Sequence, residues 1–217
     1  MEDLYPFLYA HSQGGVATVM EEIRLSTAAK AAEIEALRNE VLERYGDQLV
    51  ECAEAMAASF AAGRRLYAFG NGGSSTDAQD VATLYLHPPR GRPLAALSLT
   101  GDVATVTALS NDVGFEVVFA RQIAAFGRRD DIAFGLSTSG GSENVIRAFD
   151  DANRRGLLTV GLAGYDGGRM AEAETIDYLF VIPSASVHRI QEAQTTVFHV
   201  LWELTQQALQ PLVETEA

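Results

Sequence analysis

The sequence lacks the features that mark secreted, membrane-spanning and nucleic-acid-binding proteins. It has one cysteine in 217 residues, Cys52, so no internal disulfide can form and a reducing, cytoplasmic setting is expected. No apolar run approaches the roughly 20 residues of a membrane-spanning helix, and the acidic opening stretch does not resemble a targeting signal. Basic residues are scarce too: 16 Lys and Arg stand against 29 Asp and Glu, a net charge of −13. Such a chain repels nucleic acids and anionic membranes, so we expect neither as a partner.

Proline is absent from residues 14–63, a stretch rich in the strong helix formers Ala, Glu, Leu and Arg. We expect an N-terminal arm over residues 1–25, with an aromatic segment at 5–9, and then helices over 26–63. Gly46 followed by Asp47 predicts the end of one helix and the N-cap of a second. Apolar side chains recur every three or four residues in both. Whether these stripes form a packing layer or a subunit contact is left open by the sequence.

Short apolar runs alternate with helical stretches from residue 66 onward. The runs are continuous rather than alternating, as in strands of a parallel sheet covered on both faces. We therefore predict a single α/β domain over 64–212, a five-stranded parallel sheet sandwiched by helices in a doubly wound arrangement. The expected strands are 66–69, 94–99, 132–136, 158–163 and 178–182, and the expected helices are about 75–87, 102–109, 115–126, 142–155, 168–173 and 187–209.

Ligands of such sheets bind beyond the carboxyl ends of the strands, so the loops there are the candidate site. Two loops combine glycines with hydroxyl residues directly ahead of a helix: Asn71-Gly72-Gly73-Ser74 and Ser137-Thr138-Ser139-Gly140-Gly141-Ser142. Glycine allows close approach of the main chain, and a helix N-terminus attracts anions. The pair of loops predicts a phosphate site.

Nucleotide sites fit these loops less well. The first loop matches only half of a dinucleotide fingerprint, because Ser75 stands where the third glycine belongs. Asp102 could serve as the ribose-binding acid of that alternative, which therefore stays open. No Gly-Lys-Ser/Thr loop is present, which excludes a P-loop NTPase.

Five motifs in order resemble the sugar isomerase (SIS) domain family, and within it the phosphoheptose isomerases. They begin at Gly70, Ser110, Ser137, Gly164 and Arg189, and the resemblance runs from about residue 30 to residue 209. It implies a five-stranded parallel α/β sandwich assembled as a homotetramer, with active sites at the subunit interfaces. It also implies that the ligand is a sugar phosphate such as sedoheptulose 7-phosphate.

The resemblance assigns roles to individual residues. Ser74, Ser137, Thr138, Ser139 and Ser142 become the phosphate cradle, and Asn71 and Asp112 fall where the family contacts substrate. Gln191 and His199 fall on two of the four positions that bind zinc in the isomerase, and His199 also matches its catalytic histidine. Binding of zinc or another divalent metal at Gln191 and His199 therefore stays open.

The other half of the implied zinc site is different in this chain. Where the family has a histidine and, four residues later, a glutamate that is both a zinc ligand and the proposed base, this sequence has Asp80 and Leu84. His188 stands in place of a family aspartate. We expect Asp80 and His199 to be the catalytic pair of an altered site, to which His87 and His188 could contribute.

Three functions remain open on these observations. The first is a phosphoheptose isomerase-type aldose–ketose isomerase with an altered metal and base site. The second is a non-catalytic phosphosugar-binding regulator or scaffold, since the family includes a replication-initiator-associating protein that also lacks the glutamate. The third is a nucleotide-dependent enzyme on a Rossmann-like sheet.

Overall fold

The computed structural model describes residues 16–214, so the aromatic segment expected at residues 5–9 lies outside the described residues. The chain divides into two compact units, Met1–Ala36 and Leu37–Ala217. In the first unit, the side chains of residues 18–36 are exposed except that of Ile34, which is half-buried. The exposed set includes the apolar side chains of Val19, Met20, Ile23 and Leu25.

Helix α2 (Val16–Ala61) starts in the first unit and ends in the second without a break. The expected helix end at Gly46 and N-cap at Asp47 are therefore wrong. Val41, Tyr45 and Leu49 are buried on either side of Gly46, and the Tyr45 hydroxyl accepts a 3.2 Å hydrogen bond from the Val181 amide. This packing outweighs the roughly 1 kcal/mol that a glycine costs inside a helix.

Five parallel strands form one sheet in the order β2-β1-β3-β4-β5. They are β1 (Leu66–Gly70), β2 (Ala96–Ser98), β3 (Ile132–Ser137), β4 (Leu158–Gly164) and β5 (Tyr178–Ile182). Leu66 pairs with Ala96 on one side and with Ile132 on the other, so β1 and β3 lie at the centre with their carboxyl ends together. The predicted five-stranded parallel sheet is confirmed.

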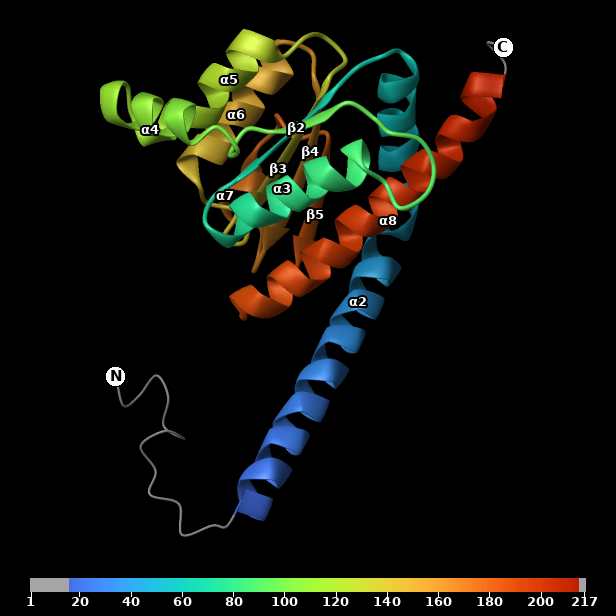
Figure 1. Ribbon diagram of the computed structural model, residues 1–217, viewed down its shortest axis with the longest axis vertical. Helices are drawn as coiled ribbons and strands as arrows, with labels where there is room; N and C mark the ends of the chain where they lie inside the picture. Colours follow the sequence, from blue (N-terminus) through green and yellow to red (C-terminus); the bar gives the residue numbers. More distant parts are fainter. Residues whose placement is uncertain (1–15, 215–217) are drawn as a thin grey trace. The chain divides into compact units, whose positions relative to one another are not determined.

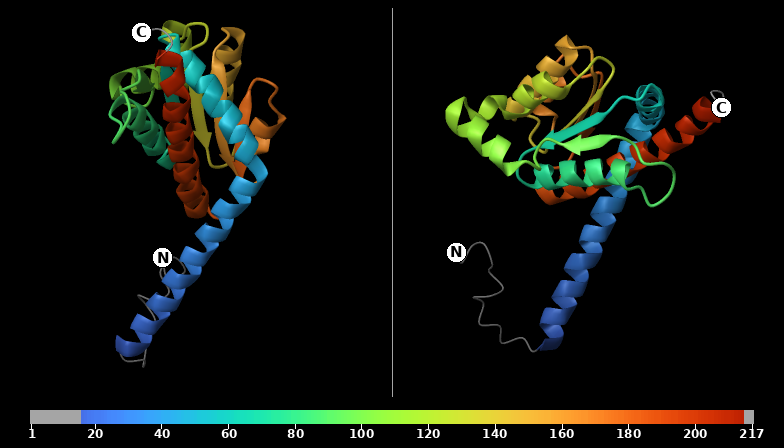
Figure 2. Two further views of the ribbon diagram at one scale, coloured as in Figure 1. Left: turned by 90° about the vertical axis from the view of Figure 1, so that its right-hand side faces the viewer. Right: turned by 45° about the horizontal axis from the view of Figure 1, so that its top comes forward.

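Helices cover both faces of this sheet (Figures 1 and 2). On one face α3 (Gly73–Leu86) packs over β1 and β2, and α8 (Val187–Glu214) packs beside it over β4 and β5. The other face carries α5 (Val118–Phe126) and α6 (Glu143–Arg154), with α4 (Val103–Asp112) and the short 3-10 helix η1 (Phe115–Val117) alongside. A short helix, α7 (Gly168–Glu172), follows β4. Within residues 16–214, none of the helices has the length and apolar character needed to cross a membrane.

Aromatic side chains fill the core between β1, β3 and the α5–α6 layer. The Phe69 ring lies 5.5 Å from that of Phe119 on α5 and 5.3 Å from that of Phe149 on α6. Gly135 on β3 leaves the space for them, because a Cβ there would stand 2.5 Å from Phe149. This core fixes the positions of β1 and β3, and therefore of the loops that follow them.

The chain leaves β1 toward one edge of the sheet and returns through β3 toward the other. The gap between the carboxyl ends of β1 and β3 is the topological switch point, where ligands of doubly wound sheets bind. Both glycine- and hydroxyl-rich loops identified in the sequence start there.

Candidate functional site

Hydroxyl groups gather where β3 ends and α6 begins. The Ser137 Oγ lies 3.0 Å from the Ser142 Oγ and 3.5 Å from the Ser139 Oγ, and the Ser139 Oγ accepts a 3.2 Å hydrogen bond from the Gly141 amide. Ser142 is the N-cap residue of α6, but its side chain does not cap the helix. We call Ser137, Thr138, Ser139 and Ser142 the serine cradle. Its hydroxyls lie at the positive end of a helix, which suits a phosphate.

Glycines bring the cradle loop against the loop after β4. A Cβ on Gly140 would stand 1.9 Å from the Gly167 carbonyl oxygen, and Gly140 has a φ of 62° that favours glycine. The Gly140 carbonyl accepts a 2.9 Å hydrogen bond from the Met170 amide on α7. Backbone contacts therefore hold the cradle loop in place, while its serine hydroxyls bond mainly to one another.

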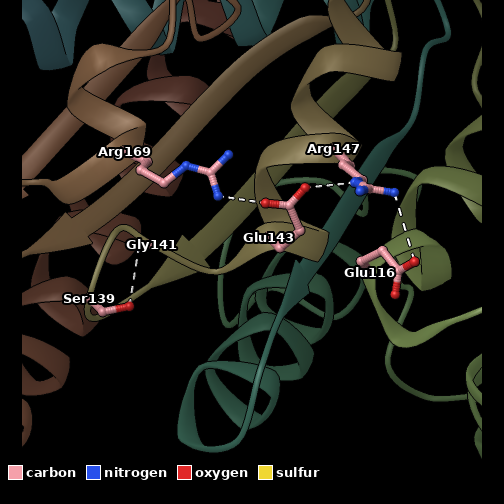
Figure 3. A network of polar contacts seen from close by, with 6 residues as sticks. All are labelled: Glu116, Ser139, Gly141, Glu143, Arg147 and Arg169. Carbon is pink, nitrogen blue, oxygen red and sulfur yellow. Dashed lines mark hydrogen bonds and ion pairs between the residues drawn. The ribbon is translucent and has the colours of Figure 1, made fainter.

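A charged network flanks the cradle (Figure 3). The Glu143 carboxylate accepts hydrogen bonds from Arg169 on α7 at 2.5 Å and from Arg147, one turn along α6, at 2.7 Å. These two arginines hold the pKa of Glu143 below its usual range, Arg169 having the larger effect. Arg147 also lies 3.9 Å from Glu116. The network offsets a negative charge that would otherwise oppose an anion at the start of α6.

The loop after β1 is tied to the same helix. Asn71 and Asn144 exchange two side-chain hydrogen bonds, of 2.8 and 2.9 Å, and Asn144 is buried in the first turn of α6. The Asn71 amide thus positions the Asn71-Gly72-Gly73 loop beside the cradle. Ser74, in the first turn of α3, is buried next to this loop.

A carboxylate that the sequence analysis did not single out lies at this end of α3. The Asp77 Oδ2 accepts a 3.0 Å hydrogen bond from the Gln191 Nε2 on α8. Burial raises the pKa of Asp77 above its ordinary value of 3.8, the Gln191 bond lowers it, and the nearby negative charge of Asp80 raises it. Asp77, Asp80 and Leu84 recur at helical spacing on one side of α3, but this spacing alone does not distinguish Asp77 from Asp80.

Gln191 is held against the α3 loop. A Cβ on Gly73 would stand 2.4 Å from the Gln191 Nε2, so a larger residue here would displace this amide. The amide group has a second N–H, which the bond to Asp77 does not use. Gln191, Asp77 and the start of α3 form one half-buried polar group beside the cradle.

The other residues expected at the site lie further along α3 and on α8. Asp80 is exposed on α3, and Leu84 is buried one turn further along. His87 is the exposed C-cap residue of α3, and His188 is exposed in the first turn of α8. His199 is exposed two turns beyond Gln191, and its ring stacks on Phe198 at 5.1 Å.

Asp112 and Asp102 lie on α4, on the far face of the sheet from α3. Asp112 ends this helix and accepts a 2.7 Å hydrogen bond from Asn111, and no contact within residues 16–214 joins it to the cradle. Asp102 is the N-cap of α4, where its carboxylate accepts hydrogen bonds from the amide and hydroxyl of Thr105. Since this carboxylate caps a helix, the ribose-binding role that kept the Rossmann-like alternative open loses its support.

The described residues do not fit the zinc site that the resemblance implies. Among residues 16–214 no group of three His, Cys, Asp or Glu side chains is placed to hold a metal ion. Gln191 is bonded to Asp77, and Leu84 offers no donor atom. The donor set of one chain is therefore too small for a closed zinc site.

A groove next to the cradle has room for more than a phosphate. It is shallow and open, with a volume of about 630 Å³, and is lined by Ser139, Tyr165, Asp166 and Ser184, among others. Tyr165 has a left-handed backbone with φ of 55°, which costs energy for a residue with a side chain. The groove lies at the carboxyl ends of β4 and β5, continuous with the cradle through Ser139.

Comparisons with known proteins agree with this geometry. The SIS domain model matches residues 31–164. The chain is 41% identical over 168 residues to a phosphoheptose isomerase from Aquifex aeolicus, covering 76% of this chain and 87% of the relative. It is 40% identical over 190 residues to one from Nitratidesulfovibrio vulgaris strain Miyazaki, covering 83% and 90%.

Solved structures lead to the same group. The phosphoheptose isomerase of Neisseria gonorrhoeae superposes with a TM-score of 0.78 at 34% identity, covering 85% of this chain and 99% of that one. That of Francisella tularensis gives a TM-score of 0.78 at 30% identity, covering 84% and 97%. The sequence motifs, the sheet and the relatives agree: the chain belongs to the SIS domain family, in the group that contains the phosphoheptose isomerases.

Proposed function

We propose that the protein is a sugar phosphate isomerase of the phosphoheptose type, which interconverts sedoheptulose 7-phosphate, or a closely related ketose phosphate, and the corresponding aldose. The observation that carries this proposal is the serine cradle beside a half-buried carboxylate, Asp77, held by Gln191. The relatives in the same family favour an isomerase over a non-catalytic binding protein, since they are named phosphoheptose isomerases.

The cradle is the proposed anchor of the substrate phosphate. Ser137, Thr138, Ser139 and Ser142 would donate hydroxyl hydrogen bonds, and the N-terminus of α6 would add its partial positive charge. Ser74 and the Asn71-Gly72-Gly73 loop border the same space, and Asp112 stays a proposed contact at the end of α4. A fixed phosphate holds the sugar chain in line with the reacting carbons.

Asp77 is the proposed base. Its carboxylate takes a proton from C1 of the open-chain ketose, the C1–H electrons form the C1=C2 bond, and the carbonyl electrons move onto O2. The carboxylic acid then returns the proton to C2 while the O1 hydroxyl gives its proton to O2, which leaves an aldehyde at C1. The raised pKa makes this carboxylate a stronger base than an ordinary aspartate.

Gln191 and His199 are the proposed partners of that step. The free N–H of the Gln191 amide can donate to the developing negative charge on O2, which lowers the barrier. His199 stays a proposed second proton-transfer group, two turns along α8. Asp80 stays the alternative carboxylate on α3, and its exposed position makes it the natural comparison for Asp77.

No step of this proposal passes through a metal, because the donors on one chain do not fit zinc. We also propose a homotetramer, for which the exposed apolar side chains of α2 provide surface, and a cytoplasmic location, consistent with a lone, buried and unpaired Cys52.

The deciding experiment is proton NMR of the protein with sedoheptulose 7-phosphate in deuterated water, with EDTA in one sample and zinc in another. We expect deuterium at C2 of an aldoheptose in both, because a proton taken by a carboxylate exchanges with solvent before it returns. Loss of the product in EDTA and its recovery with zinc would contradict the metal-free step.

The His199→Ala variant accompanies that experiment. Loss of deuterium incorporation in His199→Ala would support His199 as the second proton-transfer group. Incorporation that persists in this variant would remove His199 from the mechanism. If the wild-type protein shows no exchange while sugar resonances shift on binding, the isomerase proposal fails. The protein would then be a phosphosugar-binding regulator or scaffold.

A further inference from the structure

A second cavity opens at the opposite end of the sheet from the cradle. It encloses about 410 Å³ where β1 and β3 begin, and its lining includes Arg64, Arg65, Tyr67, Leu97, Phe126 and Arg128. A volume of this size lies within the range of small-molecule sites. β1 and β3 have five and six residues, so their lengths of roughly 15 to 20 Å, at about 3.3 Å per residue, separate this cavity from the cradle.

Arginines are concentrated here, in a chain whose net charge is −13. Neither Arg65 nor Arg128 forms an ion pair with any of the residues that the structure describes. Burial and the nearby charge of Asp131 raise the pKa of Tyr67, and the two guanidinium groups oppose that rise. Arg64, Arg65 and Arg128 all line this one cavity, so three cations border it.

One carboxylate, that of Asp131, also lines the cavity. Asp131 is buried, and its two oxygens accept hydrogen bonds from the backbone amides of Arg65 at 2.9 Å and Arg128 at 2.8 Å. This carboxylate thus holds the two loops together through their main chains, and its single charge is outnumbered by the three arginines of the lining. Arg64 lies only at the 4.0 Å limit from Asp130, and its Nε is buried without a hydrogen-bond partner in the described part of the chain.

Apolar side chains form the outer wall of the same cavity. Phe126 is 53% exposed and Leu97 is 50% exposed, so both present apolar surface to a ligand in the cavity. An aromatic ring beside arginines offers a stacking surface for a planar base and cations for the phosphates attached to it. A small inorganic anion such as phosphate, by contrast, would contact only the arginines and not the apolar wall.

We propose that this cavity, the arginine pocket, binds a nucleoside phosphate, with its phosphates on Arg65, Arg128 and Arg64 and its base against Phe126. The site is separate from the sugar phosphate site and does not depend on the proposed isomerase activity. A ligand bound there would contact the amino ends of β1 and β3, the two strands that position the catalytic loops at their other ends.

The test is calorimetric titration of the full-length protein with ADP, and separately with inorganic phosphate. We expect saturable ADP binding that weakens as salt is raised, and at least tenfold weaker binding by inorganic phosphate. The double variant Arg65→Gln/Arg128→Gln should lose at least tenfold in ADP affinity. The control Arg121→Gln/Arg154→Gln removes the same charge from exposed positions on α5 and α6 and should stay within twofold of wild type.

Two further variants separate the site from its alternatives. Phe126→Ala should weaken ADP binding but not phosphate binding, and Ser139→Ala/Ser142→Ala, in the cradle, should leave ADP binding unchanged. The proposal is overturned if ADP does not bind at millimolar concentration, if phosphate binds as well as ADP, or if the cradle variant loses ADP. It is also overturned if both arginine double variants lose affinity equally.

Discussion

The Asp77 Oδ2 lies 3.0 Å from the Gln191 Nε2, so a carboxylate–amide bond just after the first turn of α3 joins this helix to α8 beside the serine cradle. Asp77 stands about two turns before Leu84, the position where a family glutamate would provide both a base and a metal ligand. A carboxylate is thus still present on the same side of α3, closer to its N-terminus. Burial raises the pKa of this carboxylate and so strengthens it as a base.

Replacing Asp77 or Asp80 on α3 with asparagine shows which of these two carboxylates is the base. Asp77→Asn should lower kcat for ketose–aldose interconversion by roughly 10²- to 10⁴-fold, the contribution of a general base. Asp80→Asn makes the same chemical change at an exposed position one turn away and should keep most of the activity. Steady-state assays of both variants measure this, and the reverse order of effects would assign the base to Asp80.

The Asp77→Asn substitution also affects the stability of the fold, and the direction of this effect follows from the raised pKa of Asp77. Because burial raises the pKa of Asp77, the stability that this group contributes is present below the unfolded pKa and is lost as pH rises through the folded pKa. Asp77→Asn removes that charge and still accepts the Gln191 bond, so its melting temperature at pH 7 should equal or exceed that of wild type. An active-site variant that is inactive but not destabilised separates a catalytic role from a structural one.

The pH dependence of kcat/KM provides an independent check on the Asp77–Asp80 pair. Asp77 must be ionised to accept a proton, so activity should fall at low pH with an apparent pKa above 3.8. The charge of Asp80 helps to raise that pKa, so Asp80→Asn should move the acidic limb to lower pH. If the acidic limb of the profile stays in place or moves to higher pH in Asp80→Asn, Asp77 is not the group that titrates.

The sequence predicts the sheet well, because each buried parallel strand is a continuous apolar run between turn residues. The break in the first helix is predicted wrongly because a local rule, glycine followed by aspartate, is outweighed by the burial of Val41, Tyr45 and Leu49. Asp77 is missed for a related reason. Its partner Gln191 is 114 residues away in the chain, and nothing local to α3 distinguishes Asp77 from Asp80.

The cradle hydroxyls should contribute directly to substrate affinity. Ser139→Ala/Ser142→Ala removes two hydroxyls at the start of α6, and a hydrogen bond to a charged group contributes about 1.5–3 kcal/mol. We expect the dissociation constant for the sugar phosphate to rise about tenfold or more, measured by calorimetry. Ser26→Ala, on the exposed part of α2, is the matched control and should bind normally. Unchanged affinity of the double variant would refute the cradle.

The exposed apolar side chains of α2 lead to a prediction about assembly. Within residues 16–36 of this helix, Met20 and Ile23 are more than half exposed, and association of chains would remove such apolar side chains from water. We expect light scattering at micromolar concentration to give four times the 23.3 kDa chain mass. Ile23→Asp should dissociate the assembly, whereas Ala29→Asp, about 120° around the helix, should not. A monomeric wild-type protein would contradict the tetramer.

Gly73 is the most direct test of how Gln191 is positioned. Alanine at this position would place a Cβ 2.4 Å from the Gln191 Nε2, so the amide must move and its bond to Asp77 must lengthen or break. Gly73→Ala should therefore lower kcat while leaving sugar phosphate affinity nearly unchanged, because the cradle hydroxyls lie between the end of β3 and the start of α6 and not on α3. The matched control is Gly46→Ala in the interior of α2, where a Cβ would meet only Leu42 Cδ1 at 3.8 Å. That control should stay active and gain roughly 0.5–1 kcal/mol in free energy of unfolding. Equal activity of the two glycine variants would show that the Gln191 position does not matter to the chemistry.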